Sequence, residues 1–234
     1  MLKIGIICAI GREVEPFLSH IENCKITEKA LLKFYEGTIN EINVITLFCG
    51  ICKVNAAIAT QILIDCYNVN VVINAGTCGG MVNELNIFDT VISTEVAYYD
   101  VNESILTKSH PWMKTAYFSA DGKLLELAKR IAADSASDYK IVFGRVVTGE
   151  AFIADNLRNG IREKYSPLSV DMETGSIAHV CYVNHLPFIA IRTITDTPTY
   201  SGTDHFEANC KKASEIAKDV TMRLLHEMKL NYQL

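Results

Sequence analysis

The chain has 234 residues, of which 49% are hydrophobic and 21% are charged, as in a globular protein with a substantial core. Its formal net charge is -5 and its lysines and arginines are dispersed, which argues against a nucleic-acid or anionic-membrane surface. No apolar run reaches transmembrane length, and the apolar first ten residues lack a signal-peptide cleavage site, so we expect a cytoplasmic protein that acts on small molecules.

Continuous apolar runs bounded by glycine, asparagine or aspartate predict strands that are buried on both faces. These runs lie at 3–9, 43–48, 71–75, 88–97, 140–147, 167–171 and 187–194. Apolar residues at helical spacing predict helices between the strands, at 13–21, 53–67, 121–133, 155–163, 173–182 and 206–228.

The segment 30–47 interrupts this alternation of strands and helices. Two strand-like runs flank a turn at Asn40-Glu41, which predicts an antiparallel hairpin. The whole pattern predicts an α/β fold, namely a three-layer α/β/α sandwich around a twisted, mixed and mostly parallel sheet. Because no segment resembles a linker or a repeat, we expect residues 1–234 to form a single domain.

The eight cysteines could suggest disulfides or a metal site, but most of them lie inside apolar runs. A free cysteine in such a run behaves as a small hydrophobic residue. The pair Cys49 and Cys52 has the spacing of a redox motif, yet it lacks the aromatic and proline context of thioredoxin-like sites. We therefore expect structural cysteines, with no metal and no cofactor.

Three carboxylates stand where predicted strands end, at Glu13, Glu173 and Asp196. The carboxyl ends of strands in a stacked α/β protein converge on one ligand crevice, so these groups could share a site. Each also has a simpler explanation, because acidic residues favour helix starts and turns. Arg192, inside an apolar strand, is harder to explain without a carboxylate or ligand, since an unpaired buried guanidinium is strongly unfavourable.

Two further segments follow predicted strands. The segment Asn74-Ala-Gly-Thr-Cys-Gly-Gly80 has three glycines, and its backbone amides could approach a ligand closely. It matches neither a Walker A loop nor a dinucleotide fingerprint, and a tight turn explains it equally well. In Gly149-Glu-Ala-Phe-Ile153, the ring of Phe152 could stack on a flat ligand, although such residues more often belong to the core.

Taken in order, these motifs resemble the nucleoside phosphorylase and nucleosidase superfamily, and most closely the 5'-methylthioadenosine/S-adenosylhomocysteine nucleosidases. The resemblance covers nearly the whole chain. It rests on Lys3-Ile-Gly-Ile-Ile7 with Glu13-Val14, Asn74 to Gly80, Gly149 to Ile153, Val170-Asp-Met-Glu173 with Ile177-Ala-His-Val180, and Arg192-Thr-Ile-Thr-Asp196. It implies a nucleoside phosphorylase-like fold, an adenine nucleoside as substrate and a homodimer.

The resemblance implies a purine nucleosidase, which hydrolyses the N-ribosyl bond of 5'-substituted adenosines and releases adenine. Breaking the bond between adenine N9 and ribose C1' produces a poor anionic leaving group and an electron-deficient sugar, so the reaction needs both an acid and a nucleophile. By resemblance, Asp196 delivers a proton to adenine N7, which requires a carboxyl pKa raised by burial. Glu13 activates water on the opposite face of the sugar, as in inverting glycosidases.

The resemblance also assigns the groups that hold the sugar. Glu173 accepts both ribose hydroxyls, because a carboxylate can take two donors at once. Met172 packs against the sugar, and Arg192 and Thr77 help to place the water.

The remaining assignments concern the base and the 5' side. Phe152 stacks on adenine while the backbone of Ile153 pairs with the ring edge. Thr195 is the hydroxyl beside the acid, where close relatives have serine, and Phe206 borders the 5' substituent. The expected site is completed by Cys78 and Gly79.

Two other functions stay open on the residues alone. A purine nucleoside phosphorylase would need arginines to bind inorganic phosphate. Asn74 stands where bacterial hexameric phosphorylases carry arginine, Glu13 would repel phosphate, and Arg12 is the only candidate nearby. A nucleoside-binding protein without catalysis would not need the acid and the base that this chain retains.

The segment 98–112 departs from close relatives, in which the corresponding loop crosses a dimer interface and lines the pocket for the 5' group. Cys78 and Ile10 also replace an alanine and a methionine. The 5' substituent is therefore left open among methylthioadenosine, adenosylhomocysteine, 5'-deoxyadenosine and an aminofutalosine-type nucleoside. His179 is expected to be a packed core histidine.

Overall fold

The structure is a computed structural model that describes residues 2–109, 113–133, 139–153 and 155–232. In these ranges ten strands form one sheet: β1 (Lys3–Cys8), β2 (Glu22–Lys29), β3 (Leu32–Ile39), β4 (Ile42–Phe48), β5 (Val71–Gly80), β6 (Thr90–Tyr98), β7 (Tyr117–Ser119), β8 (Ile141–Thr148), β9 (Ser169–Asp171) and β10 (Phe188–Asp196). The same ranges contain seven helices: α1 (Gly11–Leu18), α2 (Lys53–Tyr67), α3 (Glu103–Ser109), α4 (Gly122–Ala133), α5 (Asp155–Tyr165), α6 (Thr174–Val183) and α7 (Thr203–Asn231).

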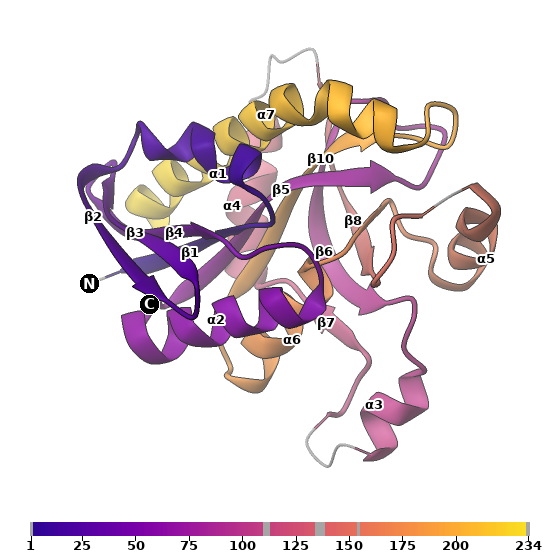
Figure 1. The fold of residues 1–234 in the computed structure, drawn as a ribbon, viewed down its shortest axis with the longest axis horizontal. Helices are drawn as coiled ribbons and strands as arrows, with labels where there is room; N and C mark the ends of the chain where they lie inside the picture. Colours follow the sequence, from indigo (N-terminus) through magenta and orange to yellow (C-terminus); the bar gives the residue numbers. More distant parts are fainter. Residues whose placement is uncertain (1, 110–112, 134–138, 154, 233–234) are drawn as a thin grey trace.

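The helices cover both faces of the sheet, as predicted for a three-layer α/β/α fold (Figure 1). α1 and α4 contact α7 on one face, while α2 contacts α6 on the other. Each pair of layers encloses its own apolar core. The first core includes Ile6, Val14, Phe17, Leu124, Leu224 and Met228, and the second includes Ile7, Leu47, Leu63, Val72 and Ile177.

The sheet is mixed, with the strand order β10-β6-β8-β9-β5-β1-β4-β3-β2 and β7 paired to β6. β1 lies between β4 and β5 and is parallel to both, and the predicted hairpin is the antiparallel pair β3 and β4. β5 is long enough to pair with β1 near its start and with β9 at Gly79 and Gly80, while β10 runs along its other edge. The strands β5, β10, β6, β8 and β9 therefore close into a ring, which the sequence did not predict.

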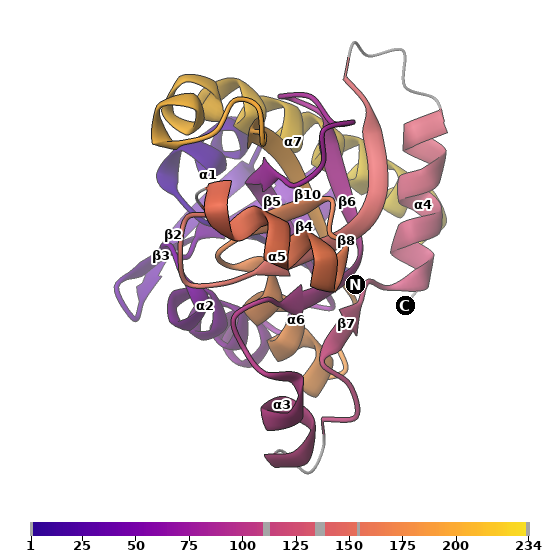
Figure 2. The same cartoon turned by 90° about the vertical axis from the view of Figure 1, so that its right-hand side faces the viewer.

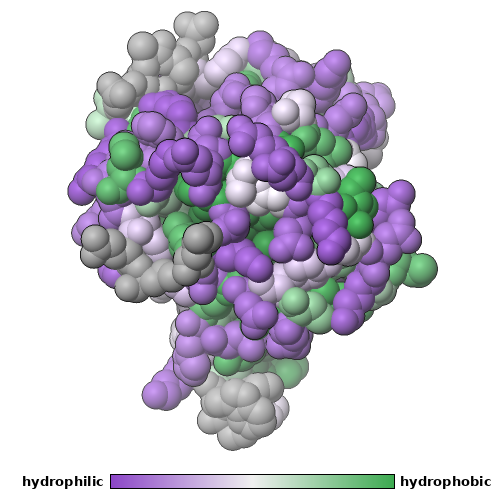
Figure 3. Space-filling model, turned by 90° about the vertical axis from the view of Figure 1, so that its left-hand side faces the viewer, coloured by the Kyte–Doolittle hydropathy of each residue, from purple (hydrophilic) through white to green (hydrophobic). Residues whose placement is uncertain are grey.

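The sequence also failed to predict β2, β7 and α3. All but one residue of β2 is exposed, and its charged side chains lie on the edge of the sheet, so the strand lacks the buried apolar run on which prediction relies. The surface on this side of the molecule is largely hydrophilic (Figure 3). α3 buries none of its residues, and it stands away from the body in two perpendicular views (Figures 1 and 2).

The interpretation of the glycine-rich segment as a tight turn was wrong. β5 continues as a regular strand through Asn74 to Gly80, because these residues pair with β10 and β9. All eight cysteines are free thiols, and five of them are buried. None of the helices in the described ranges combines the length and the apolar composition of a membrane span.

Candidate active site

A cavity of about 240 Å³ opens where β1, β5, β9 and β10 reach their carboxyl ends. Its lining comprises Ala9, Ile10, Glu13, Ile51, Thr77, Cys78, Gly79, Ala151, Phe152, Ile153, Arg158, Val170, Asp171, Met172, Glu173, Thr195, Asp196, Thr203, Phe206 and Glu207. Every residue that the sequence placed at the site lies in this lining except Arg192. The strand ends thus converge on one crevice, as expected for a stacked α/β fold.

Glu13 is buried, and four donors hold its carboxylate. The backbone N–H groups of Ala9 and Ile10 donate to Oε2 at 2.7 and 3.3 Å. The backbone N–H and the hydroxyl of Thr77 both donate to Oε1 at 2.7 Å. A Cβ at Gly76 would lie 2.6 Å from the carboxyl carbon of Glu13, so only glycine allows β5 to pass this close. The orientation of the carboxylate is therefore set by the β1–α1 turn and by β5.

Asn74 lies in β5, two positions before Gly76, and is fully buried. Its side-chain amide donates to the backbone oxygen of Ile7 at 2.9 Å and accepts from the hydroxyl of Thr174 at 2.6 Å. Asn74 therefore ties β5 to β1 and to the start of α6, and it does not line the cavity.

Glu173 lies at the start of α6, where its side chain is buried in the wall of the cavity. The backbone N–H of Cys52 donates to Oε1 at 3.0 Å, and Nη2 of Arg192 donates to Oε2 at 3.4 Å. Burial raises the pKa of Glu173 to about 8, and the positive charge of Arg192 opposes this shift. Burial thus weakens the preference of this carboxyl for its ionised form.

Arg192 lies behind the lining, where it contacts two of the lining residues. Its Nε forms an ion pair with Oδ2 of Asp171 at 3.1 Å, and its Nη2 reaches Glu173. Asp171 is held in turn, because its Oδ1 accepts a hydrogen bond from the hydroxyl of Thr148 at 2.6 Å. The expectation that this buried guanidinium needs a carboxylate or a ligand is confirmed, because two carboxylates contact it.

Asp196 ends β10 and is only 2% exposed. The hydroxyl of Thr195 donates to Oδ1 at 3.0 Å, and Nη2 of Arg158 donates to Oδ2 at 2.8 Å. A Cβ at Gly79 would lie 3.2 Å from Oδ2, so β5 also approaches this carboxylate closely. Burial raises the pKa of Asp196, and the hydrogen bonds from Arg158 and Thr195 partly offset the shift.

Arg158 is a residue of the site that the sequence analysis missed. It lies on α5 and is 3% exposed, with Ile161 and Tyr165 buried on the same face of the helix. Positions 158, 161 and 165 form a helical stripe, so an arginine on this otherwise apolar face was the available signal.

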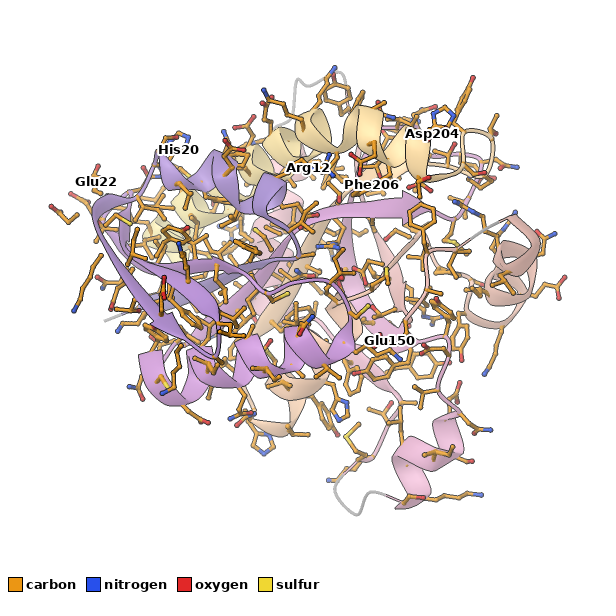
Figure 4. All side chains as sticks on the ribbon, viewed as in Figure 1. Arg12, His20, Glu22, Glu150, Asp204 and Phe206 are labelled. Carbon is orange, nitrogen blue, oxygen red and sulfur yellow. The ribbon has the colours of Figure 1, made fainter. Side chains whose placement is uncertain are left out.

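Aromatic rings border the mouth of the cavity. Phe152 is 42% exposed, and its ring meets that of Phe206 edge to face with 6.5 Å between centroids. The guanidinium of Arg12 lies 5.6 Å from the centroid of Phe206 and donates to both carboxylate oxygens of Glu207, at 2.6 and 2.9 Å. In Figure 4 the side chains of Arg12 and Phe206 lie close together where α1 and α7 begin.

His179 does not line this cavity. It is half-buried on α6, where its ring stacks on Phe118 with 5.0 Å between centroids, and its Nδ1 lies 3.3 Å from the hydroxyl of Tyr98. This packing agrees with the expectation of a structural histidine.

The model of the phosphorylase superfamily matches residues 3–226 of the chain. A 5'-methylthioadenosine/S-adenosylhomocysteine nucleosidase of Anoxybacillus flavithermus is 34% identical over 232 residues, which cover 97% of this chain and 99% of the relative. The nucleosidase of the same name from Colwellia psychrerythraea, solved in complex with adenine, superposes with a TM-score of 0.88 at 30% identity, over 97% of this chain and 95% of that one. The one from Neisseria meningitidis, in complex with methylthio-immucillin-A, gives a TM-score of 0.87 at 29% identity, over 96% and 99% of the two chains.

Proposed function

Because the chain belongs to the phosphorylase superfamily, and within it to the 5'-methylthioadenosine/S-adenosylhomocysteine nucleosidases, we propose that the cavity is the active site of a purine nucleosidase. The enzyme hydrolyses the N-ribosyl bond of 5'-substituted adenosines and releases adenine. The observation that carries this proposal is the meeting of three buried carboxylates, Glu13, Glu173 and Asp196, at one cavity.

Asp196 is the acid in this proposal. The raised pKa of Asp196 favours a protonated carboxyl, which can donate to adenine N7. As the proton moves to N7, the electron pair of the C1'–N9 bond is taken up by the purine, and adenine leaves as a neutral molecule. The exposed ring of Phe152 is the surface on which adenine stacks, with the Ile153 backbone at the ring edge.

Glu13 is the base. Its carboxylate is oriented before substrate enters, because Thr77 and two backbone amides hold it. The contact from the Ile10 N–H is the longest of the four at 3.3 Å, and in our proposal the attacking water replaces it. The water oxygen bonds to C1' while Glu13 takes its proton, as in inverting glycosidases.

Glu173 is the ribose-binding group, with Met172 against the sugar. The two ribose hydroxyls are donors, so binding the sugar favours the ionised form of Glu173 and opposes the effect of burial on its pKa. Arg192 lies behind the cavity lining, and its positive charge favours this ionised form. It therefore acts on substrate through Glu173.

A phosphorylase is the second candidate, and the geometry disfavours it. Phosphate needs positive groups where Glu13 now lies. Arg12 is partly exposed and engaged by the carboxylate of Glu207, and Asn74 is buried in contacts with backbone and with a hydroxyl. A binding protein without catalysis is the third candidate, but it has no need of an oriented base and a buried acid.

The assembly and location belong to the same proposal. We expect a homodimer, because Val54 and Ile58 of α2 expose 69% and 44% of their surface near Ile51, and α3 buries none of its residues within its own chain. Part of the segment 98–112 lies outside the described residues. Free thiols throughout the chain suit a reducing cytoplasm, and one continuous sheet suits a single domain over residues 1–234.

The deciding experiment measures adenine released from methylthioadenosine with and without inorganic phosphate. We expect equal rates in both conditions, with the free sugar as second product. Release that depends on phosphate would identify a phosphorylase, and tight binding without release would identify a binding protein.

Asp196→Asn tests the assignment of the acid. Turnover should fall by about 100-fold or more, because general acid catalysis contributes that much, while methylthioadenosine binding measured by calorimetry should persist. Near-wild-type turnover in this variant would remove Asp196 from the acid role.

A further inference from the structure

Arg158 reaches the same carboxylate that the proposed mechanism uses as its acid, yet the mechanism gives it no task. Its guanidinium is buried in the cavity wall. Nη2 donates to Oδ2 of Asp196 at 2.8 Å, and Nη1 donates to the backbone oxygen of Gly80. α5 therefore contributes a positive charge that is anchored to β5 and directed at the end of β10.

The two oxygens of Asp196 differ in what they can carry. A guanidinium only donates hydrogen bonds, and an unprotonated carboxyl oxygen accepts from it better than the hydroxyl oxygen of a protonated carboxyl, so the contact of Arg158 with Oδ2 favours the acidic proton on Oδ1. The hydroxyl of Thr195 faces Oδ1 at 3.0 Å and the backbone oxygen of Cys78 at 3.2 Å. A hydroxyl can donate to Cys78 and still accept from Oδ1, so Oδ1 tolerates either protonation state.

We propose that Arg158 is a positioning residue for the acid: it holds Oδ2 of Asp196, directs the acidic proton to Oδ1, and compensates the carboxylate charge once the proton has moved to the purine. This inference rests on the proposed function, since it presupposes that Asp196 is the acid. In the step itself the Oδ1–H bond breaks, its electron pair stays on the carboxylate, and the proton bonds to the purine.

The positive charge of Arg158 has two opposite effects on the acid function of Asp196, and these effects make the proposal testable. A buried carboxylate without a partner is strongly unfavourable, so Arg158 stabilises the form of Asp196 that exists after proton transfer. The same charge lowers the pKa of Asp196 against the effect of burial, so it narrows the pH range in which the acid is protonated. The other groups that face Asp196 are Thr195, His205 on α7 and the Cys78 thiol on β5.

The test compares Arg158→Met, Arg158→Gln and Arg158→Lys with a matched control, Arg162→Met, which lies one turn further along α5. The readouts are kcat and KM for methylthioadenosine across pH. In Arg158→Met we expect kcat at its optimum to fall by about 10- to 100-fold. We also expect the alkaline loss of kcat to move up by about one pH unit, because an attractive charge has been removed from the acid.

The conservative variants separate charge from shape. In Arg158→Lys, the pH at which kcat is lost on the alkaline side should return to its wild-type value. Arg158→Gln keeps hydrogen-bond donors but lacks the charge, so this pH should be shifted as in Arg158→Met. Arg162→Met should change neither quantity. A fall of kcat by the same factor at every pH would show a merely structural role and would overturn the proposal. An unchanged kcat in Arg158→Met would also overturn it. If the methionine variant does not fold, the glutamine variant carries the same test.

Asp196→Asn provides the background that separates this inference from the proposed function. If Asp196→Asn turns over normally, the acid assignment itself fails. If Asp196→Asn lowers turnover as expected, Arg158→Met in that background should add no further loss to the residual rate, because the effects of residues that act on one step are not additive. A full additional loss in the double variant would show that Arg158 acts elsewhere and would overturn the inference alone.

Discussion

Gly76→Ala is the most direct test of how the fold positions the proposed base. The new Cβ would lie 2.6 Å from the carboxyl carbon of Glu13, whereas ordinary contacts begin at 3.4 Å. The carboxylate must therefore retreat by roughly 0.8 Å, or β5 must bend away from it. Four hydrogen bonds resist that retreat, so the substitution strains the centre of the site.

The expected effects follow from this displacement. Misplacing a catalytic group by about 1 Å lowers the rate by about 100-fold, so kcat for methylthioadenosine should fall by that order. Overpacking should lower the free energy of unfolding by about 1 to 3 kcal/mol, which for a chain of this length lowers Tm by roughly 2 to 12 °C. KM should change much less than kcat, because in our proposal Glu173, and not Glu13, binds the sugar.

The assay follows adenine release and thermal unfolding side by side. Gly122→Ala is the matched control, because a Cβ at the start of α4 meets nothing within 4 Å. If Gly76→Ala keeps wild-type kcat while its Tm falls, the close approach of β5 to Glu13 is not what orients the base, and this account of how the fold positions Glu13 is refuted.

Two further substitutions test the other walls of the cavity. Glu173→Gln should raise Tm relative to the wild type by an amount that grows between pH 5 and pH 8. Burial raises the pKa of Glu173 from 4.5 to about 8. The folded wild type thus binds the extra proton in this window and loses stability as pH rises, whereas glutamine does not titrate. Calorimetric scans at both pH values check this, and a Tm difference that is independent of pH would contradict it. Phe152→Leu should raise KM for methylthioadenosine by about 3- to 10-fold through the loss of ring stacking, with kcat nearly unchanged in steady-state assays. A fall in kcat at constant KM would instead place Phe152 in the chemical step.

The elements that were predicted from the sequence are those whose burial leaves a local signature. Buried strands such as β1 and β10 are covered on both faces, so they appear as continuous apolar runs. α2 was predicted with its observed bounds of Lys53–Tyr67, and the hairpin turn at Asn40-Glu41 was also confirmed. The order of motifs along the chain identified the family, because each motif keeps its place at a strand end.

The arrangement of the strands around the cavity was decided by tertiary structure. The glycine-rich segment became part of β5 because β9 and β10 satisfy its backbone, and no local pattern shows which strands will pair. β2 was not predicted because nearly all of its side chains lie in solvent, so its sequence lacks a buried apolar run.

The chain alone determined which residue types stand at the strand ends, and hence that carboxylates, a threonine and aromatic side chains could share a crevice. It did not determine which charges would touch. Arg192 meets Asp171 and Glu173 behind the cavity wall, and Arg158 meets Asp196 across 38 positions of sequence. Local periodicity records whether a side chain is buried, whereas its partner depends on the packing of distant elements. The buried ion pair at Asp196 therefore became visible only when the fold brought Arg158 of α5 to the ends of β5 and β10.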